Sequence, residues 1–287
     1  MERRNAGIFV AAIIAIVVIW ARLFLPTWDY YPPNSLVDGL ERSWFVAAGL
    51  RDLAFFGYVV VALGMMTVFF SIIQRRWALS AALKGLLYGT SLGVIWAFGF
   101  LTGWAFLETT LRAEILNCVI DLIGLAAAGW AVGLLVGQDL PSAAREIAKP
   151  WLAVVFIASG FVAVHTLGAM SFVVPFGETA DLLLRPRSLL QYGLLVALGA
   201  WAGQMFVMLR HALPIKSVVT RSAFFAFGVF GHSWILFHLF FVIEFAGVFV
   251  TTLLTGVMGS AGVFVGILAY EWIAGGERPT LEQRSVS

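Results

Sequence analysis

Three polar side chains inside one apolar stretch are spaced as on a single helix face. Glu114, Asn117 and Asp121 are separated by three and four residues, so a helix presents them on one side. Asp121 would then lie about two turns, or about 9–10 Å, inside that helix. A carboxylate at such depth usually faces a bundle interior or a watery cavity, which suggests a functional role. In the structural alternative, Asp121 pairs with Arg112 or with a backbone group near the membrane surface.

A second polar group consists of histidines in two other apolar stretches. His165 lies a little past the middle of one stretch, whereas in the other His232 lies near the middle and His238 about two turns further out. Glu244 stands near the end of the second stretch. His232 and His238 are about 240° apart around a helix, so they face different sides, and His165 can face one of them. Buried histidines can ligate a b-type haem or carry protons, or they can simply hydrogen-bond to a neighbouring helix.

The elements that must position these groups are eight apolar runs, each long enough to cross a membrane. We expect spanning helices near residues 6–25, 53–73, 82–106, 115–137, 151–174, 188–209, 221–245 and 248–273. Hydrophobic residues make up 61% of the chain and charged residues 12%, about half the charged share of a soluble domain. The first run follows two arginines, as in a signal peptide, but no small-residue cleavage site follows it, so we expect it to be retained. The fold class is therefore an all-α integral membrane protein with eight transmembrane helices.

Short patterns recur in the same order in the two halves of the chain. They are VALG at 61–64 and 196–199, Gly93-x-x-Trp96 with Gly231-x-x-Trp234, and Gly129-x-x-x-Gly133 with Gly262-x-x-x-Gly266. This order predicts two four-helix repeats, residues 1–140 and 141–287, within one membrane domain. Because each repeat holds an even number of spans, the two repeats are parallel bundles lying side by side. The four-residue glycine spacing also predicts faces where neighbouring helices approach closely.

The distribution of basic residues predicts how the chain lies in the membrane. Most lysines and arginines fall in the segments that share a side with the N-terminus, so we expect a multi-pass protein of the cell membrane, inner or plasma, with both termini cytoplasmic. The lipid bilayer is the expected partner, together with a second copy of the chain or other subunits. No clustered basic face favours nucleic acid. The single cysteine, Cys118, excludes an intrachain disulfide.

The buried polar residues favour a permease- or channel-like protein for a small solute or ion, with its path at the repeat interface. The binding or pathway residues we expect are Glu114, Asn117, Asp121, His165, His232, His238 and Glu244. The chain contains no H-E-x-x-H, G-x-S-x-G or Walker A pattern, so no metal site is expected and an enzymatic activity is not favoured. A membrane enzyme acting on a lipid-like substrate is a third hypothesis, with Glu108, Glu114 and Glu244 at a depth that suits acid–base groups near the membrane surface.

The alternative function is a membrane anchor subunit of a larger complex, linked to haem or quinone. Two fused four-helix bundles are similar in architecture to the haem A synthases and to the membrane anchors of bacterial quinone-linked reductases. The resemblance implies a b-type haem as a candidate cofactor. Those families place several histidines in corresponding helices of both bundles, whereas the first half of this chain contains none, so no residue role is carried over.

Overall fold

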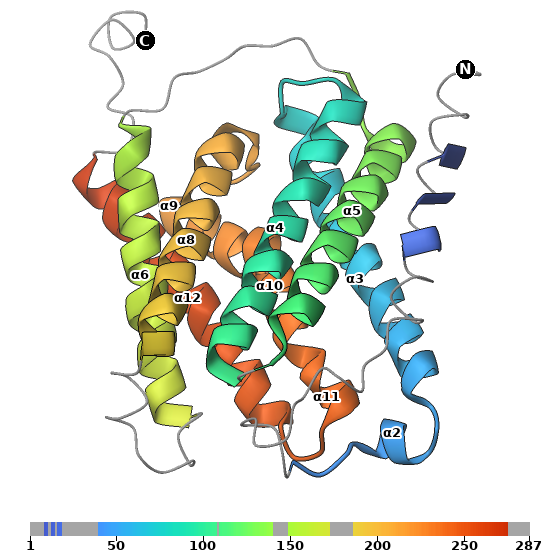
Figure 1. The fold of residues 1–287 in the computed structure, drawn as a ribbon. Coiled ribbons are helices and arrows are strands. Elements are labelled where there is room, and N and C mark those ends of the chain that lie inside the picture. The colour runs from blue at the N-terminus through green and yellow to red at the C-terminus, as the bar shows by residue number, and fades with distance from the viewer. Residues whose placement is uncertain are drawn as a thin grey trace, which may run out of the picture.

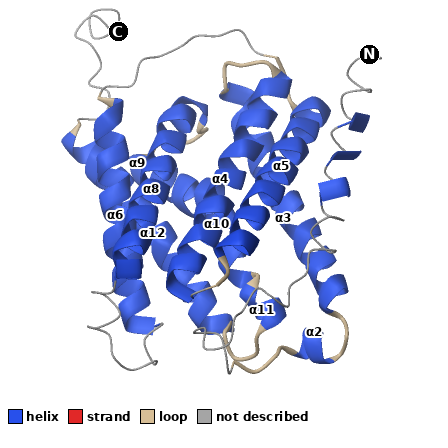
Figure 2. Cartoon of the chain, viewed as in Figure 1, coloured by secondary structure: helices blue, strands red, loops and turns tan. Residues whose placement is uncertain are grey.

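The structure is a computed structural model. It describes residues 9–10, 13–14, 16–18, 40–107, 109–139, 149–172 and 186–274. Within these ranges the regular structure is helical, as Figure 2 shows. The single β-type pairing in the same ranges is the isolated bridge between Arg42 and Phe245. An all-helical architecture is what a bilayer requires, because each helix satisfies its own backbone hydrogen bonds.

Seven helical spans in the described part of the chain are long and apolar enough to cross a membrane. Their helices are α3 (Arg51–Ile73) with η1 (Gln74–Arg76), α4 (Ala81–Leu107), α5 (Leu111–Val136), α6 (Pro150–Phe172), α8 (Pro186–Leu209) with η2 (Arg210–Ala212), the four segments α9 (Val218–Ala223), η3 (Phe224–Phe230), α10 (Gly231–Leu239) and α11 (Phe241–Glu244), and α12 (Phe249–Ile273). A short helix, α2 (Trp44–Ala47), precedes α3. Seven of the eight predicted spans thus correspond to helices. Most of the first run, residues 6–25, lies outside the described residues, so an eighth span stays a prediction.

Proline positions explain two of the helix starts. Pro150 and Pro186 are the first residues of α6 and α8. A helix tolerates proline there because its first N–H groups have no partner within the helix, and the fixed φ of proline suits the first turn. Pro214 lies between η2 and α9, where the chain leaves one span and enters the next.

Two groups of helices lie on either side of α10 (Figure 1). The most extensive contacts join α4 with α5, and α6 with both α8 and α12. In the figure α10 lies between these groups, and it contacts α3 and α4 on one side and α12 on the other. Contacts between α4 and α8 complete the connection. The residues of α10 are therefore placed to interact with both halves of the bundle.

Glycines allow two of these helix pairs to approach closely. A Cβ atom added at Gly133 would meet backbone atoms of Ala81 and Gly85 on α4. At Gly266 it would fall under 3.0 Å from backbone atoms of Phe156 and Ile157 on α6. Small residues are what such contacts require, because membrane helices associate through close van der Waals packing. The glycine spacing read from the sequence therefore marks real contact faces.

The two glycine pairs nevertheless face different neighbours. The pair on α5, Gly129 and Gly133, packs on α4, the span before it. The pair on α12, Gly262 and Gly266, packs on α6, three spans earlier. In the proposed alignment of the halves, α4 corresponds to the span that contains α10, and α6 corresponds to the first run. Equivalent glycines thus have non-equivalent partners, and the four-plus-four repeat stays a prediction.

Lys84 is a buried cation that joins three helix ends. Its side chain is fully buried, and its Nζ donates to the backbone oxygens of Gln74 at 2.9 Å and Gln138 at 2.7 Å. The Gln74 carbonyl lies in η1, directly after α3, and the Gln138 carbonyl lies two residues after the end of α5. One lysine therefore connects α4 with the ends of both neighbours.

Replacing Lys84 with methionine is expected to lower the free energy of unfolding by about 1–3 kcal/mol, because two carbonyls lose a donor while the volume is nearly kept. The midpoint of thermal unfolding in detergent measures this change. Lys216→Met, at an exposed position, serves as the matched control. Equal midpoints for the two variants would contradict the role assigned to Lys84.

Candidate functional site

The polar face of α5 begins at its first turn. Glu114 is buried there and accepts a hydrogen bond from Thr109 Oγ1, with 2.6 Å between the oxygens. Asn117 is buried one turn further on. Asp121 follows after another turn and is half-buried. The acidic residue at the helix start is held by a local hydroxyl, whereas Asp121 lies deeper in the span, beside a cavity.

That cavity measures about 70 Å³ and is lined by residues of α3, α4 and α5 together with Val18. Its walls include Val59 and Leu63 of α3, Trp96 of α4, and Asp121 and Gly124 of α5. The volume is sufficient for more than one water molecule. The lining is almost entirely apolar apart from the Asp121 carboxylate and the Trp96 indole. A single carboxylate at the wall of an apolar cavity is the most distinctive local arrangement among the predicted residues.

Trp96 connects this cavity to α10. Its indole Nε1 donates to Ser233 Oγ at 2.9 Å. Ser233 follows His232 in the sequence. Tyr58 on α3 donates from its hydroxyl to the backbone oxygen of Leu236 at 2.8 Å, and its ring centroid lies 6.0 Å from that of Trp96. Tyrosine and tryptophan therefore provide polar links between α3, α4 and α10.

The span that carries His232 and His238 departs from regular α-helix. Residues of η3, Phe224–Phe230, follow a π-helical pattern, and a turn at Phe240 separates α10 from α11. Gly228 in η3 lies against the ring of Phe69, and a Cβ there would meet that ring. Short π segments inside α-helices occur frequently at functional sites. The irregular segment comes directly before His232.

His232 faces the first group of helices. Its Nδ1 is hydrogen-bonded to the backbone oxygen of Gly228. Its ring stacks on Phe69 of α3, with 4.9 Å between centroids. It is thus separated in direction from His238, as their six-residue spacing requires.

His238 faces α6 and meets His165. The two ring centroids are 6.2 Å apart, and Trp234 contacts both rings, at 4.3 Å from His238 and 5.7 Å from His165. Phe161 stacks on His165 at 5.3 Å with nearly parallel planes. Of the two partners that depth allowed for His165, the structure selects His238.

Glu244 lies apart from the other predicted residues and is ion-paired. Its Oε1 is 2.7 Å from Nε of Arg51 at the start of α3. Ser43 strengthens the same connection, since its N–H donates to the Glu244 backbone oxygen at 3.1 Å and its hydroxyl donates to that of Ile243. Glu244 therefore ties α11 to the segment that leads into α3. The predicted residues form several separate groups rather than one continuous lining.

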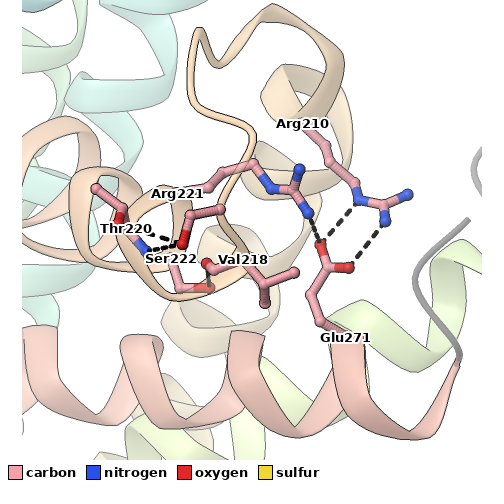
Figure 3. Close-up of polar contacts among 7 residues, drawn as sticks. Arg210, Val218, Thr220, Arg221, Ser222 and Glu271 are labelled. Atoms are coloured by element: carbon pink, nitrogen blue, oxygen red, sulfur yellow. Dashed lines mark hydrogen bonds and ion pairs between the residues drawn. The ribbon is translucent and has the colours of Figure 1, made fainter.

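A buried ion triad at the opposite end of the bundle was not anticipated from the sequence (Figure 3). Arg210 binds the Glu271 carboxylate through two hydrogen bonds of 3.0 and 2.9 Å, and Arg221 adds a third of 2.9 Å. Glu271 is 5% exposed and Arg210 8%. The signal in the sequence was a glutamate near the end of an apolar run and two arginines beside other runs. Charges at such places usually mark the membrane surface, so their burial and pairing were not evident.

Comparison of the chain with protein-family models, with curated proteins and with solved structures finds no match.

Proposed function

We propose that this chain is a permease- or channel-like membrane protein for a small solute or ion. The observation that carries the proposal is the Asp121 carboxylate at the wall of a cavity of about 70 Å³ within the spanning helices. Ionisable side chains at membrane depth are energetically costly and commonly mark pathways for ions or substrates. The apolar spanning helices are compatible with a multi-pass membrane protein. The proposed location is the cell membrane, with both termini on the cytoplasmic side.

The proposed path runs from the Asp121 cavity past Trp96 towards α10. Trp96 borders the cavity and donates to Ser233, so one side chain contacts both the cavity and the irregular span. A change in the geometry of α10 would alter this hydrogen bond and thereby the wall of the cavity. Glu114 and Asn117 extend the same α5 face towards one end of the helix, and His232 lies next to Ser233. His238 faces His165 on α6 and Glu244 pairs with Arg51, so these three predicted residues lie outside the proposed path.

The proposal predicts that Asp121→Asn slows permeation. Protein in liposomes is tested with three probes, namely protons followed by an internal pH dye, potassium, and urea followed by vesicle swelling. At least one probe is expected to pass faster than through protein-free liposomes, and Asp121→Asn is expected to slow it at least about tenfold, which corresponds to about 1.4 kcal/mol.

Asp52→Asn is the matched control, because Asp52 has a side chain 72% exposed at the start of α3. Detergent gel filtration of both variants establishes that they are folded. The proposal is overturned if none of the probes passes faster than through empty vesicles, or if the two variants conduct equally.

A haem-bearing anchor subunit is the less supported function. The candidate ligands are His165 and His238, but the indole of Trp234 contacts both rings beside the space between them. A porphyrin between these histidines would require the volume that Trp234 occupies, and nearby Phe161 also packs on His165. The residues present therefore do not fit a haem in this conformation.

A further inference from the structure

The facing histidines of α6 and α10 have the separation expected of two ligands of one metal ion. Their ring centroids are 6.2 Å apart. With metal–nitrogen bonds of about 2.0–2.1 Å, two imidazoles on opposite sides of an ion place their centroids about 6 Å apart. A haem iron would need the same separation, but Trp234 and Phe161 pack against the pair where a porphyrin would lie, so the pair suits a bare ion.

Each of these histidines has one ring nitrogen that is not used in the described contacts. His238 Nδ1 is 2.9 Å from the backbone oxygen of Trp234, so that nitrogen carries the proton and Nε2 keeps its lone pair. His165 Nδ1 is buried and has no hydrogen-bond partner, while the backbone of Thr255 approaches the ring. A buried nitrogen without a partner calls for an explanation, such as an ion or a water molecule that satisfies it.

The surroundings favour a monovalent ion. The rings that contact the histidine pair are those of Phe161, Trp234 and Phe237. In the described part of the chain, no third histidine, cysteine or carboxylate joins the pair in a larger metal-binding group. Two neutral imidazoles leave the charge of the ion uncompensated, and burying an uncompensated charge is costly. A single positive charge costs less than a double one.

We propose that His165 and His238 form a two-coordinate site for a monovalent d¹⁰ metal ion, Cu(I) or its analogue Ag(I). Such ions accept two ligands in a linear arrangement, and imidazole is a good ligand for copper. Zinc prefers four ligands in a tetrahedron, which this pair does not supply. The site is separate from the Asp121 cavity and does not depend on the proposed permeation path.

The test measures Ag(I) bound to the purified full-length protein in detergent and chloride-free buffer, by equilibrium dialysis and elemental analysis. Cys118 is replaced by alanine throughout, because its thiol is a competing soft ligand. One Ag(I) per chain is expected. His165→Gln and His238→Gln are each expected to lower the affinity at least about tenfold, or about 1.4 kcal/mol.

His232→Gln is the matched control, because His232 is buried in the same span as His238 but contacts Phe69 and Gly228 instead. It is expected to bind Ag(I) as the parent does. Circular dichroism and gel filtration identify any variant that fails to fold. In that case, methionine is placed at the same histidine position, and because methionine is a soft ligand this variant is expected to retain Ag(I) binding. The proposal is overturned if the parent binds no Ag(I), if His232→Gln and His238→Gln bind equally, or if Zn(II) binds more tightly than Ag(I).

Discussion

Replacing Glu271 with glutamine is expected to destabilise the protein by about 3–5 kcal/mol, because it leaves the buried guanidinium group of Arg210 and the half-buried one of Arg221 without a counter-charge. Arg210 and Arg221 both bind this carboxylate, at N–O distances of 2.9–3.0 Å. Glutamine keeps the shape and one acceptor oxygen but removes the negative charge. The midpoint of thermal unfolding in detergent, together with the yield of monodisperse protein, measures the effect.

Glu41→Gln provides the control, since Glu41 is exposed and its described hydrogen bond uses its backbone oxygen. A second change, Arg221→Gln, is expected to restore part of the stability of Glu271→Gln because it removes one of the two uncompensated charges. If Glu271→Gln and Glu41→Gln unfold at the same temperature, the triad does not hold η2, α9 and α12 together.

The triad also shows where inference from the sequence ends. An apolar run fixes where a helix crosses the membrane, because its length must match the hydrocarbon thickness. For this reason, the predicted span 248–273 and the observed α12, Phe249–Ile273, nearly coincide. Whether Glu271 at the end of that helix faces lipid headgroups or two arginines depends on the rotation of α12 against α8 and α9. Apolar residues on every side of a helix carry no information about that rotation.

The histidines illustrate the same limit. Position along a helix predicted that His165 could meet either His232 or His238, and their spacing predicted that these two face apart. The choice of His238 required the packing of α6 beside α10, in which Trp234 contacts both histidine rings and Phe161 stacks on His165. Sequence periodicity does not encode which helices become neighbours.

For Asp121, depth and helix face could be predicted from the spacing on α5, but the cavity could not. The cavity is lined by Val59 and Leu63 of α3, by Trp96 of α4 and by Asp121 of α5. These contacts join residues from three helices. The hypothesis of a functional carboxylate thus came from the sequence, and its surroundings came from tertiary packing.

Replacing Gly89 with leucine is expected to separate α4 from α5 and to lower the stability by more than the about 1–3 kcal/mol typical of an overpacked core. A Cβ at this position would lie under 3.0 Å from backbone atoms of Leu125 and Gly129. Side chains can adopt other rotamers, but a helix backbone can move only as a unit, so the neighbouring contact of Gly85 with Gly133 is lost as well. The measurement is the unfolding midpoint in detergent, with gel filtration to detect aggregation.

Gly103→Leu on the same helix is the control that isolates packing from helix propensity. No atom lies within 4 Å of a Cβ added at Gly103. Leucine is favoured over glycine in a helix by somewhat under about 1 kcal/mol at either position, so propensity alone would stabilise both variants. Opposite signs for the two substitutions are therefore expected, with Gly89→Leu destabilising and Gly103→Leu neutral or stabilising. If both variants gain stability, α4 and α5 do not pack backbone to backbone, and the packing of α4 on α5 beside the Asp121 cavity is contradicted.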